Sequence, residues 1–261
     1  MPIHQASLFE LLETKHNQYN TPAFIEDDPI SIPHLFTKKE DIEIAGFLTA
    51  LIAWGKRSLI LKGAKRMMEI MDYQPHDFVT NASERELDYW VHYVYRTFQS
   101  TDAQALIRAL QYVYREKGGL ESIFLPEMSE KSVEEPVYYA LTNARNFLTS
   151  IPDFPERTQK HLANPAKGAS AKRLNMFLRW MVRKDLRGVD FGIWNCLTPA
   201  ELLCPLDIHT GNIGRKLGLL TVSQDNWKAT VALTKSLRTF CKEDPVKYDF
   251  ALFGLGIYDK L

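Results

Sequence analysis

The sequence lacks long apolar runs, is poor in cysteine and carries no net charge. None of its apolar stretches approaches the ~20 residues that a helix needs to cross a bilayer. The N-terminal residues also lack the basic-then-apolar pattern of a signal peptide, so we expect a cytoplasmic protein that does not bind membranes. The three cysteines, Cys196, Cys204 and Cys241, are odd in number and widely spaced. This argues against a disulfide framework and leaves no four-cysteine metal or iron–sulfur site, so we expect no metal and no cofactor.

The charge balance hides a local excess of cations. The 261 residues contain 32 basic and 32 acidic side chains, so the overall charge does not indicate a nucleic-acid partner. Between residues 160 and 187, however, Asp185 is the only acid among the following cations: Lys160, Lys167, Lys172, Arg173, Arg179, Arg183, Lys184 and Arg187. A local basic strip can bind phosphate although the whole chain is neutral. The alternative is a solvated helix face with no ligand.

Alternating patterns of useful length, the signature of strands, are also missing, as are internal repeats and low-complexity tracts. Apolar residues instead recur at helical spacing, and we predict an all-α protein. The expected helices include 6–17, 38–53, 134–150, 171–183 and 227–240. Ser58 is expected to cap a helix that runs to about Asp72 and is stopped by Pro75.

A capping box is expected at Ser83, with Glu86 three residues later. The helix that follows would carry Tyr89, Trp90 and Val94 on its apolar stripe. A short strand within 89–95 is the less favoured interpretation, because the flanking periodicity is helical.

Two segments between residues 164 and 219 contain candidate catalytic and phosphate-binding residues. The first, Pro165-Ala166-Lys167-Gly168-Ala169-Ser170, predicts a small-residue turn, and Lys172 follows at the start of a helix. Glycine permits a positive φ, and the unpaired N–H groups of a helix start attract anions such as phosphate. The second segment, Pro205-Leu206-Asp207-Ile208-His209, places Asp207 at the start of the next helix.

These segments resemble the helix-hairpin-helix DNA glycosylase superfamily, in the 8-oxoguanine glycosylase/lyase branch that carries a catalytic lysine. Residues 168–176 look like the second half of its hairpin motif, and 205–209 resemble its catalytic-aspartate segment, Pro-Val-Asp-Val-His. Residues 249–253 are similar to the helix that contacts the flipped base, and 44–70, more loosely, to the helix pair that enters the DNA. An uncharacterised bacterial family with the same core also fits.

This chain departs from the family pattern at two places. Ser170 stands where the second glycine of the hairpin is usual, and Asp249 stands where a base-contacting glutamine is expected. The cluster cysteines of the endonuclease III type are absent.

The resemblance implies a two-lobed helix-hairpin-helix glycosylase-like fold over residues 1–261, with a cleft between the lobes. A central helical lobe would span about 38–163. The second lobe would combine 1–37 with 164–261 and contain the hairpin at 164–183.

The resemblance also implies a reaction and the residues that perform it. The chain would be a monomer that excises an oxidised purine, such as 8-oxoguanine, from double-stranded DNA and then cleaves the strand as a β-lyase. Lys172 would be the Schiff-base nucleophile, and Asp207 the carboxylate that stabilises the sugar cation and shuttles protons. The implied DNA contacts are Lys167, Gly168, Ser170, Arg173, His209, Lys56 and Arg57, and the implied base pocket is Met176, Asp249 and Phe253.

A nucleophilic lysine must first lose its proton, because the free side chain, with a pKa of about 10.4, is charged at neutral pH. A helix N-terminus and partial desolvation against DNA both favour the neutral amine.

Each of these residues also has a simpler interpretation. Taken alone, Lys172 is a solvated lysine, Asp207 an N-cap and His209 a surface histidine, while Met176 and Phe253 are core residues. Two other functions therefore stay open, namely a non-catalytic DNA-binding protein on the same fold and an all-α protein-interaction scaffold. The damaged base and the opposite-base preference cannot be derived from the sequence.

Overall fold

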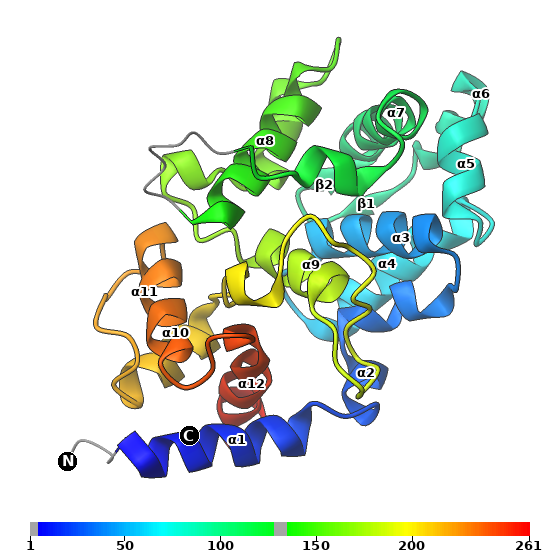
Figure 1. Ribbon diagram of the computed structural model, residues 1–261. Coiled ribbons are helices and arrows are strands. Elements are labelled where there is room, and N and C mark those ends of the chain that lie inside the picture. The colour runs from blue at the N-terminus through cyan, green and yellow to red at the C-terminus, as the bar shows by residue number, and fades with distance from the viewer. Residues whose placement is uncertain (1–4, 128–134) are drawn as a thin grey trace. The chain divides into compact units, whose positions relative to one another are not determined.

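The computed structural model describes residues 5–127 and 135–261, and these residues are mostly helical (Figure 1). The all-α prediction is thereby confirmed. Within those ranges the strands form one two-stranded antiparallel sheet, β1 (Val94–Tyr95) with β2 (Phe98–Gln99). No helix of the described residues combines the length and the apolar character needed to cross a bilayer.

The chain divides into two compact units. In the described residues, the first unit contains 5–24, 135–138 and 164–261, and the second contains 25–127 and 139–163. Residues 25–37, which we expected in the same lobe as the C-terminal part, group with the second unit. Residues 1–4 and 128–134 of the expected lobes, and the first residue of the helix expected at 134–150, lie outside the described residues.

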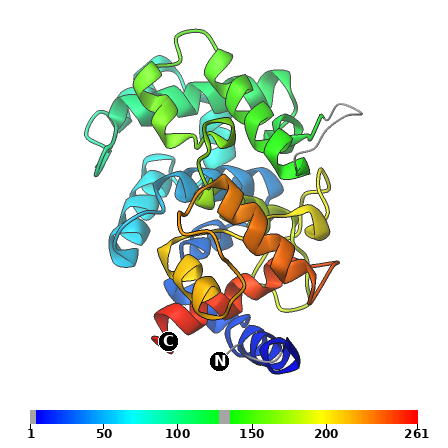
Figure 2. The same ribbon diagram turned by 90° about the vertical axis from the view of Figure 1, so that its left-hand side faces the viewer.

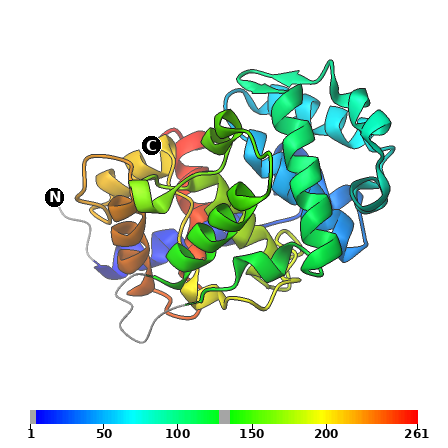
Figure 3. The same cartoon turned by 90° about the horizontal axis from the view of Figure 1, so that it is seen from above.

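The second unit is built around α3 (Lys39–Ile52), which is buried from Ile42 to Ile52 because it is apolar on nearly all sides. Helices α4 (Arg57–Ile70) and α5 (Pro75–Asn81) pack against α3, and the long α7 (Ser100–Glu116) packs against α5 (Figure 3). The shorter elements are η1 (Pro29–Ser31), η2 (Pro33–Leu35), α6 (Glu84–Leu87), η3 (Asp88–Trp90), η4 (Leu120–Phe124) and η5 (Glu156–His161). Helices α2 (Ala23–Asp27) and α8 (Pro136–Ser150) each have residues in both units.

Several helix boundaries of this unit differ from expectation. The N-cap of α4 is Lys56 in extended conformation, so the prediction of Ser58 as the cap is wrong by two residues. Helix α4 already ends at Ile70, and Pro75 begins α5, since proline fits the first helical position, where its missing N–H is not needed. The capping box at Ser83 is confirmed, because the Ser83 N–H donates to the Glu86 carboxylate at 2.8 Å.

The helix expected to continue through Val94 is wrong, because the chain turns into the β1–β2 hairpin instead. Arg96 adopts a left-handed conformation (φ 53°) at the turn. The Tyr95 hydroxyl donates to the Trp54 carbonyl at 2.6 Å, and Phe98 is fully buried. Aromatic side chains pack well on a pleated strand, and here tertiary packing of Tyr95 and Phe98 prevailed over the local helical pattern.

The first unit is organised around α12 (Asp249–Ile257), which packs against both α1 (Gln5–Tyr19) and α10 (Ile208–Lys216) (Figure 2). Its other helices are η6 (Pro165–Lys167), α9 (Lys172–Val182), η7 (Pro199–Glu201), α11 (Trp227–Arg238) and η8 (Pro245–Tyr248). Helix α12 approaches α1 closely at Gly254, where an added Cβ would overlap the ring of Tyr19.

We expect Gly254→Ala to destabilise the protein by about 1–3 kcal/mol, because the methyl group forces the Tyr19 ring out of its place. The matched control is Gly256→Ala in the same helix, where the nearest atom to an added Cβ is 3.3 Å away. Urea unfolding of both variants checks this, and a Gly254→Ala protein as stable as the control would contradict it.

Candidate functional site

The small-residue turn predicted after Asn164 is present in the first unit, and residues 165–171 are called the hairpin below. Element η6 ends at Lys167, and its C-cap Gly168 adopts the left-handed conformation (φ 81°) that glycine accepts without strain. The hairpin is attached to α11, because the Trp227 N–H donates to the Gly168 carbonyl at 3.0 Å. From α9, the Asn175 amide donates to the Ser170 carbonyl at 3.0 Å. The turn therefore has a defined place relative to both helices.

Ala171, the residue before Lys172, is also left-handed (φ 50°, ψ 31°) and is the N-cap of α9. For a residue with a Cβ this conformation costs about 1–2 kcal/mol. The side chain of Ala171 makes no capping hydrogen bond to the N–H groups of the first helical turn. Lys172 is thus the first residue of a helix whose start carries partial positive charge.

Asp207 lies next to Lys172, and it uses its two carboxylate oxygens differently. As the N-cap of α10, Asp207 accepts the Thr210 N–H on Oδ1 at 2.9 Å. Its Oδ2 lies 3.8 Å from Nζ of Lys172. The two side chains are 29% and 22% exposed, so both can meet solvent or a ligand. The structure therefore brings together the two residues that the sequence singled out for catalysis, and the capping interpretation of Asp207 holds at the same time.

Asp249 is buried near this pair and is already bonded within the protein. Its Oδ2 accepts a hydrogen bond from Arg179, and the thiol of Cys204 lies 3.8 Å from its Oδ1. Burial raises the pKa of Asp249 to about 6; the charge of Arg179 opposes the rise, and the carboxylate of Asp207 adds to it. The guanidinium of Arg179 lies over the ring of Phe250, 4.4 Å from its centroid. Contact of Asp249 with an extruded base stays a prediction, and it would require exchange of these bonds.

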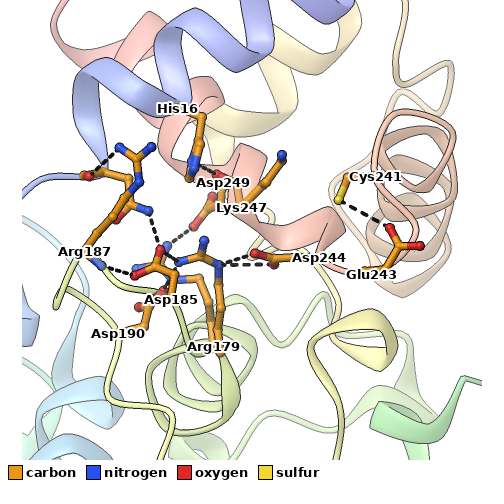
Figure 4. Close-up of polar contacts among 12 residues, drawn as sticks. His16, Arg179, Asp185, Arg187, Asp190, Cys241, Glu243, Asp244, Lys247 and Asp249 are labelled. Carbon is orange, nitrogen blue, oxygen red and sulfur yellow. Dashed lines mark hydrogen bonds and ion pairs between the residues drawn. The ribbon is translucent and has the colours of Figure 1, made fainter.

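Two arginines of the basic strip are not available to phosphate. Arg179 and Arg183 are only 3% and 1% exposed, so neither is part of a phosphate-binding strip or of a solvated helix face. Arg179 donates to Asp190 at 3.2 Å as well as to Asp249, and Arg183 contacts three carboxylates at 2.8–2.9 Å. Figure 4 shows these carboxylates, which belong to Asp185, Asp190 and Asp244, gathered around the guanidinium groups. Of the four aspartates that pair with the two arginines, Asp190, Asp244 and Asp249 lie outside residues 160–187. A count of charges within 160–187 therefore could not show the pairing.

The remaining predicted DNA contacts differ in their exposure. Lys167 and Gly168 are exposed on the hairpin, and His209 is exposed on α10. Ser170 and Arg173 are half-buried, and burial lowers the pKa of Arg173 to about 10. Lys56 and Arg57 belong to the second unit, where they start α4. All seven contacts stay predictions.

The predicted base pocket draws on two helices of the first unit. Met176 lies on α9 and is 7% exposed. Phe253, on α12, is half-buried and meets the rings of Phe24 and Tyr258 edge-on, with centroids 5.8 and 6.3 Å away. These aromatic contacts were not expected from the sequence. Among the described residues, no group of three or more His, Cys, Asp or Glu side chains could hold a metal ion.

The chain matches a protein-family model over most of its length. The model of a family described as "Protein of unknown function (DUF2400)" matches residues 28–258, which is most of the chain. No curated protein and no solved structure matches it.

His16 is a buried histidine on α1. It is 5% exposed, and its Nδ1 lies 3.0 Å from the Lys247 carbonyl oxygen, to which a protonated Nδ1 donates (Figure 4). Burial, together with the charges of Arg183, Arg187 and Lys247, lowers the pKa of His16 from 6.5 to about 4. The folded protein thus holds this imidazole neutral.

We expect the free energy of unfolding to fall by about 3 kcal/mol between pH 6.5 and pH 4 through this one group. The contribution is complete above the unfolded pKa of 6.5 and is lost as the pH falls toward the folded pKa of about 4, because the unfolded chain takes up the proton first. Denaturant unfolding across this range should show a smaller loss for His16→Gln than for wild type. His92→Gln, at an exposed histidine, is the control. Identical profiles for wild type and His16→Gln would contradict the assignment.

Proposed function

The chain belongs to the DUF2400 family, and we propose that it is a DNA glycosylase with β-lyase activity on an oxidised purine such as 8-oxoguanine. The proposal includes the two-lobed helix-hairpin-helix glycosylase fold. The observation that supports it most is the 3.8 Å approach of the Lys172 amine to the Asp207 carboxylate, beside a hairpin rich in small residues. The two residues come from separate motifs of the sequence, and each is partly exposed.

In the proposed reaction, Asp207 Oδ2 takes the proton of the Lys172 ammonium, either directly or through one water. The neutral Nζ attacks C1′ of the nucleotide, the C1′–N9 bond breaks, and the base leaves with the bonding electrons and takes up a proton. The carboxylate of Asp207 stabilises the positive charge that develops on the sugar. The C1′–O4′ bond then breaks, O4′ takes up the proton that Nζ gives up, and a Schiff base forms between Nζ and C1′.

The lyase step follows from that Schiff base. The iminium acidifies the C2′ proton; a base removes it, and the C3′–O bond breaks with departure of the 3′ phosphate. Water finally hydrolyses the conjugated imine and releases Lys172. One residue thus performs both steps as nucleophile, and Asp207 lies 3.8 Å from Nζ, where it can serve the proton transfers.

The hairpin supports this proposal as a site for the sugar–phosphate strand. The exposed Gly168 has no side chain and lets a phosphate approach the backbone, while the start of α9 carries partial positive charge. Lys167, exposed on the same turn, adds a cation. Phosphate contacts of this kind position a duplex without reading its sequence.

We expect borohydride to trap wild-type protein covalently on a duplex that contains 8-oxoguanine or another oxidised purine, and Lys172→Ala to give no adduct. Lys167→Ala, which removes an exposed lysine from the preceding turn, is the matched control and should still be trapped. Mass spectrometry of the adduct identifies the residue.

An adduct on another lysine would contradict the assignment of Lys172. No adduct with any damaged base, combined with salt-dependent binding to duplex DNA, would instead support a non-catalytic DNA-binding protein. Absence of such binding would favour the interaction scaffold.

Asp207→Asn separates capping from catalysis, because asparagine caps a helix about as well as aspartate but cannot accept a proton in the same way. We expect base excision to slow by about 10²–10⁴-fold, with the unfolding midpoint nearly unchanged. Single-turnover excision and urea unfolding measure the two effects. Wild-type excision by this variant would mean that Asp207 serves only as the cap of α10.

A further inference from the structure

A hollow of about 340 Å³ lies between α10 and α12 in the first unit. His209, Asn212 and Lys216 line it from α10, with Ile213 between them, and Gly256 lines it from α12. An added Cβ at Gly256 would lie 3.3 Å from the Cβ of His209. The glycine thus lets α12 lie close to α10.

Three polar side chains face this hollow without partners inside the protein. His209, Asn212 and Lys216 follow one another at intervals of three and four residues, which places them on one face of α10. All three are exposed, and in the described part of the chain none of their side chains makes a hydrogen bond or an ion pair. The neighbouring Arg215 behaves differently, because it is bonded to Asp225 at 2.5 Å and to the Val222 carbonyl at 2.9 Å.

The charged side chains that line the hollow are cations. They are Lys216 and Arg215, of which Arg215 is bonded to Asp225, and Leu261 completes the lining. An imidazole, an amide and an ammonium group offer several N–H donors, which suit the oxygens of a phosphate.

The residues that line the hollow from α10 extend away from the proposed reacting pair. Helix α10 begins immediately after Asp207, so the positions from His209 to Lys216 lead away from the Lys172–Asp207 pair. At 1.5 Å per residue they extend over about 10 Å. A DNA strand carries one phosphate per ~3.4 Å of helix axis, so about three phosphates fit along this length.

We propose that this hollow is a phosphodiester subsite, in which Asn212 and Lys216 hold the DNA strand next to the reacting nucleotide. This inference rests on the proposed DNA function, and it extends the contact expected at His209 by about two turns of α10. Lys216 contributes charge, and the amide of Asn212 contributes a hydrogen bond.

The test is the salt dependence of affinity for a 20-base-pair duplex with a tetrahydrofuran abasic analogue, which cannot be excised. Between about 50 and 200 mM salt, Lys216→Ala should reduce the slope of log K against log[salt] by about 0.9. Asn212→Ala should weaken binding at every salt concentration with an unchanged slope. Lys235→Ala, at an exposed lysine of α11 in the same unit, is the matched control and should keep the wild-type slope.

Equal slopes for Lys216→Ala and Lys235→Ala would overturn the subsite even if borohydride traps Lys172. A slope reduced only by Lys216→Ala would support the subsite even if no adduct forms, so the two proposals fail separately. A last experiment adds inorganic phosphate at constant ionic strength. If phosphate displaces the duplex from wild type but not from Lys216→Ala, the hollow binds the free anion, and the proposal is overturned.

Discussion

The candidate site of the first unit depends on the buried ion pairs of Arg179 and Arg183. They tie α9 to Asp249 of α12 and to carboxylates of the segments around residues 190 and 244. Charges this deeply buried are tolerated only when they are paired, and removal of one partner leaves an uncompensated charge, which commonly costs about 3–5 kcal/mol. The orientation of α9 is therefore strongly constrained, and with it the direction in which Lys172 leaves the first turn of that helix.

Asp207 shows how one residue can serve structure and chemistry together. Its Oδ1 caps α10, which holds the carboxylate in one orientation, and its Oδ2 is left to face Lys172. The left-handed Ala171 completes the arrangement from the other side, because it turns the chain sharply between the hairpin and α9. Two helix starts thus meet, one contributing an amine and the other a carboxylate.

The local features of the fold were largely predictable. Helical spacing predicted most of the long helices, and the capping box at Ser83 and the N-cap at Asp207 follow from residue types a few positions apart. The β1–β2 hairpin was not predictable in this way, because Tyr95 is held by Trp54, about forty residues earlier in the chain. The burial of Arg179 and Arg183 was not predictable either. Three of the carboxylates that pair with them belong to Asp190, Asp244 and Asp249, which lie outside residues 160–187.

By itself, the sequence determined the helical class, the turn at Gly168 and the positions of Lys172 and Asp207 at two helix starts, since periodicity and capping act over a few residues. Only the tertiary structure decided that these two groups lie 3.8 Å apart, that Arg179 and Arg183 are buried, and that Asn212 and Lys216 border an open hollow. Such contacts join residues distant in the chain, and their geometry depends on how whole helices pack, which no local pattern of residues specifies.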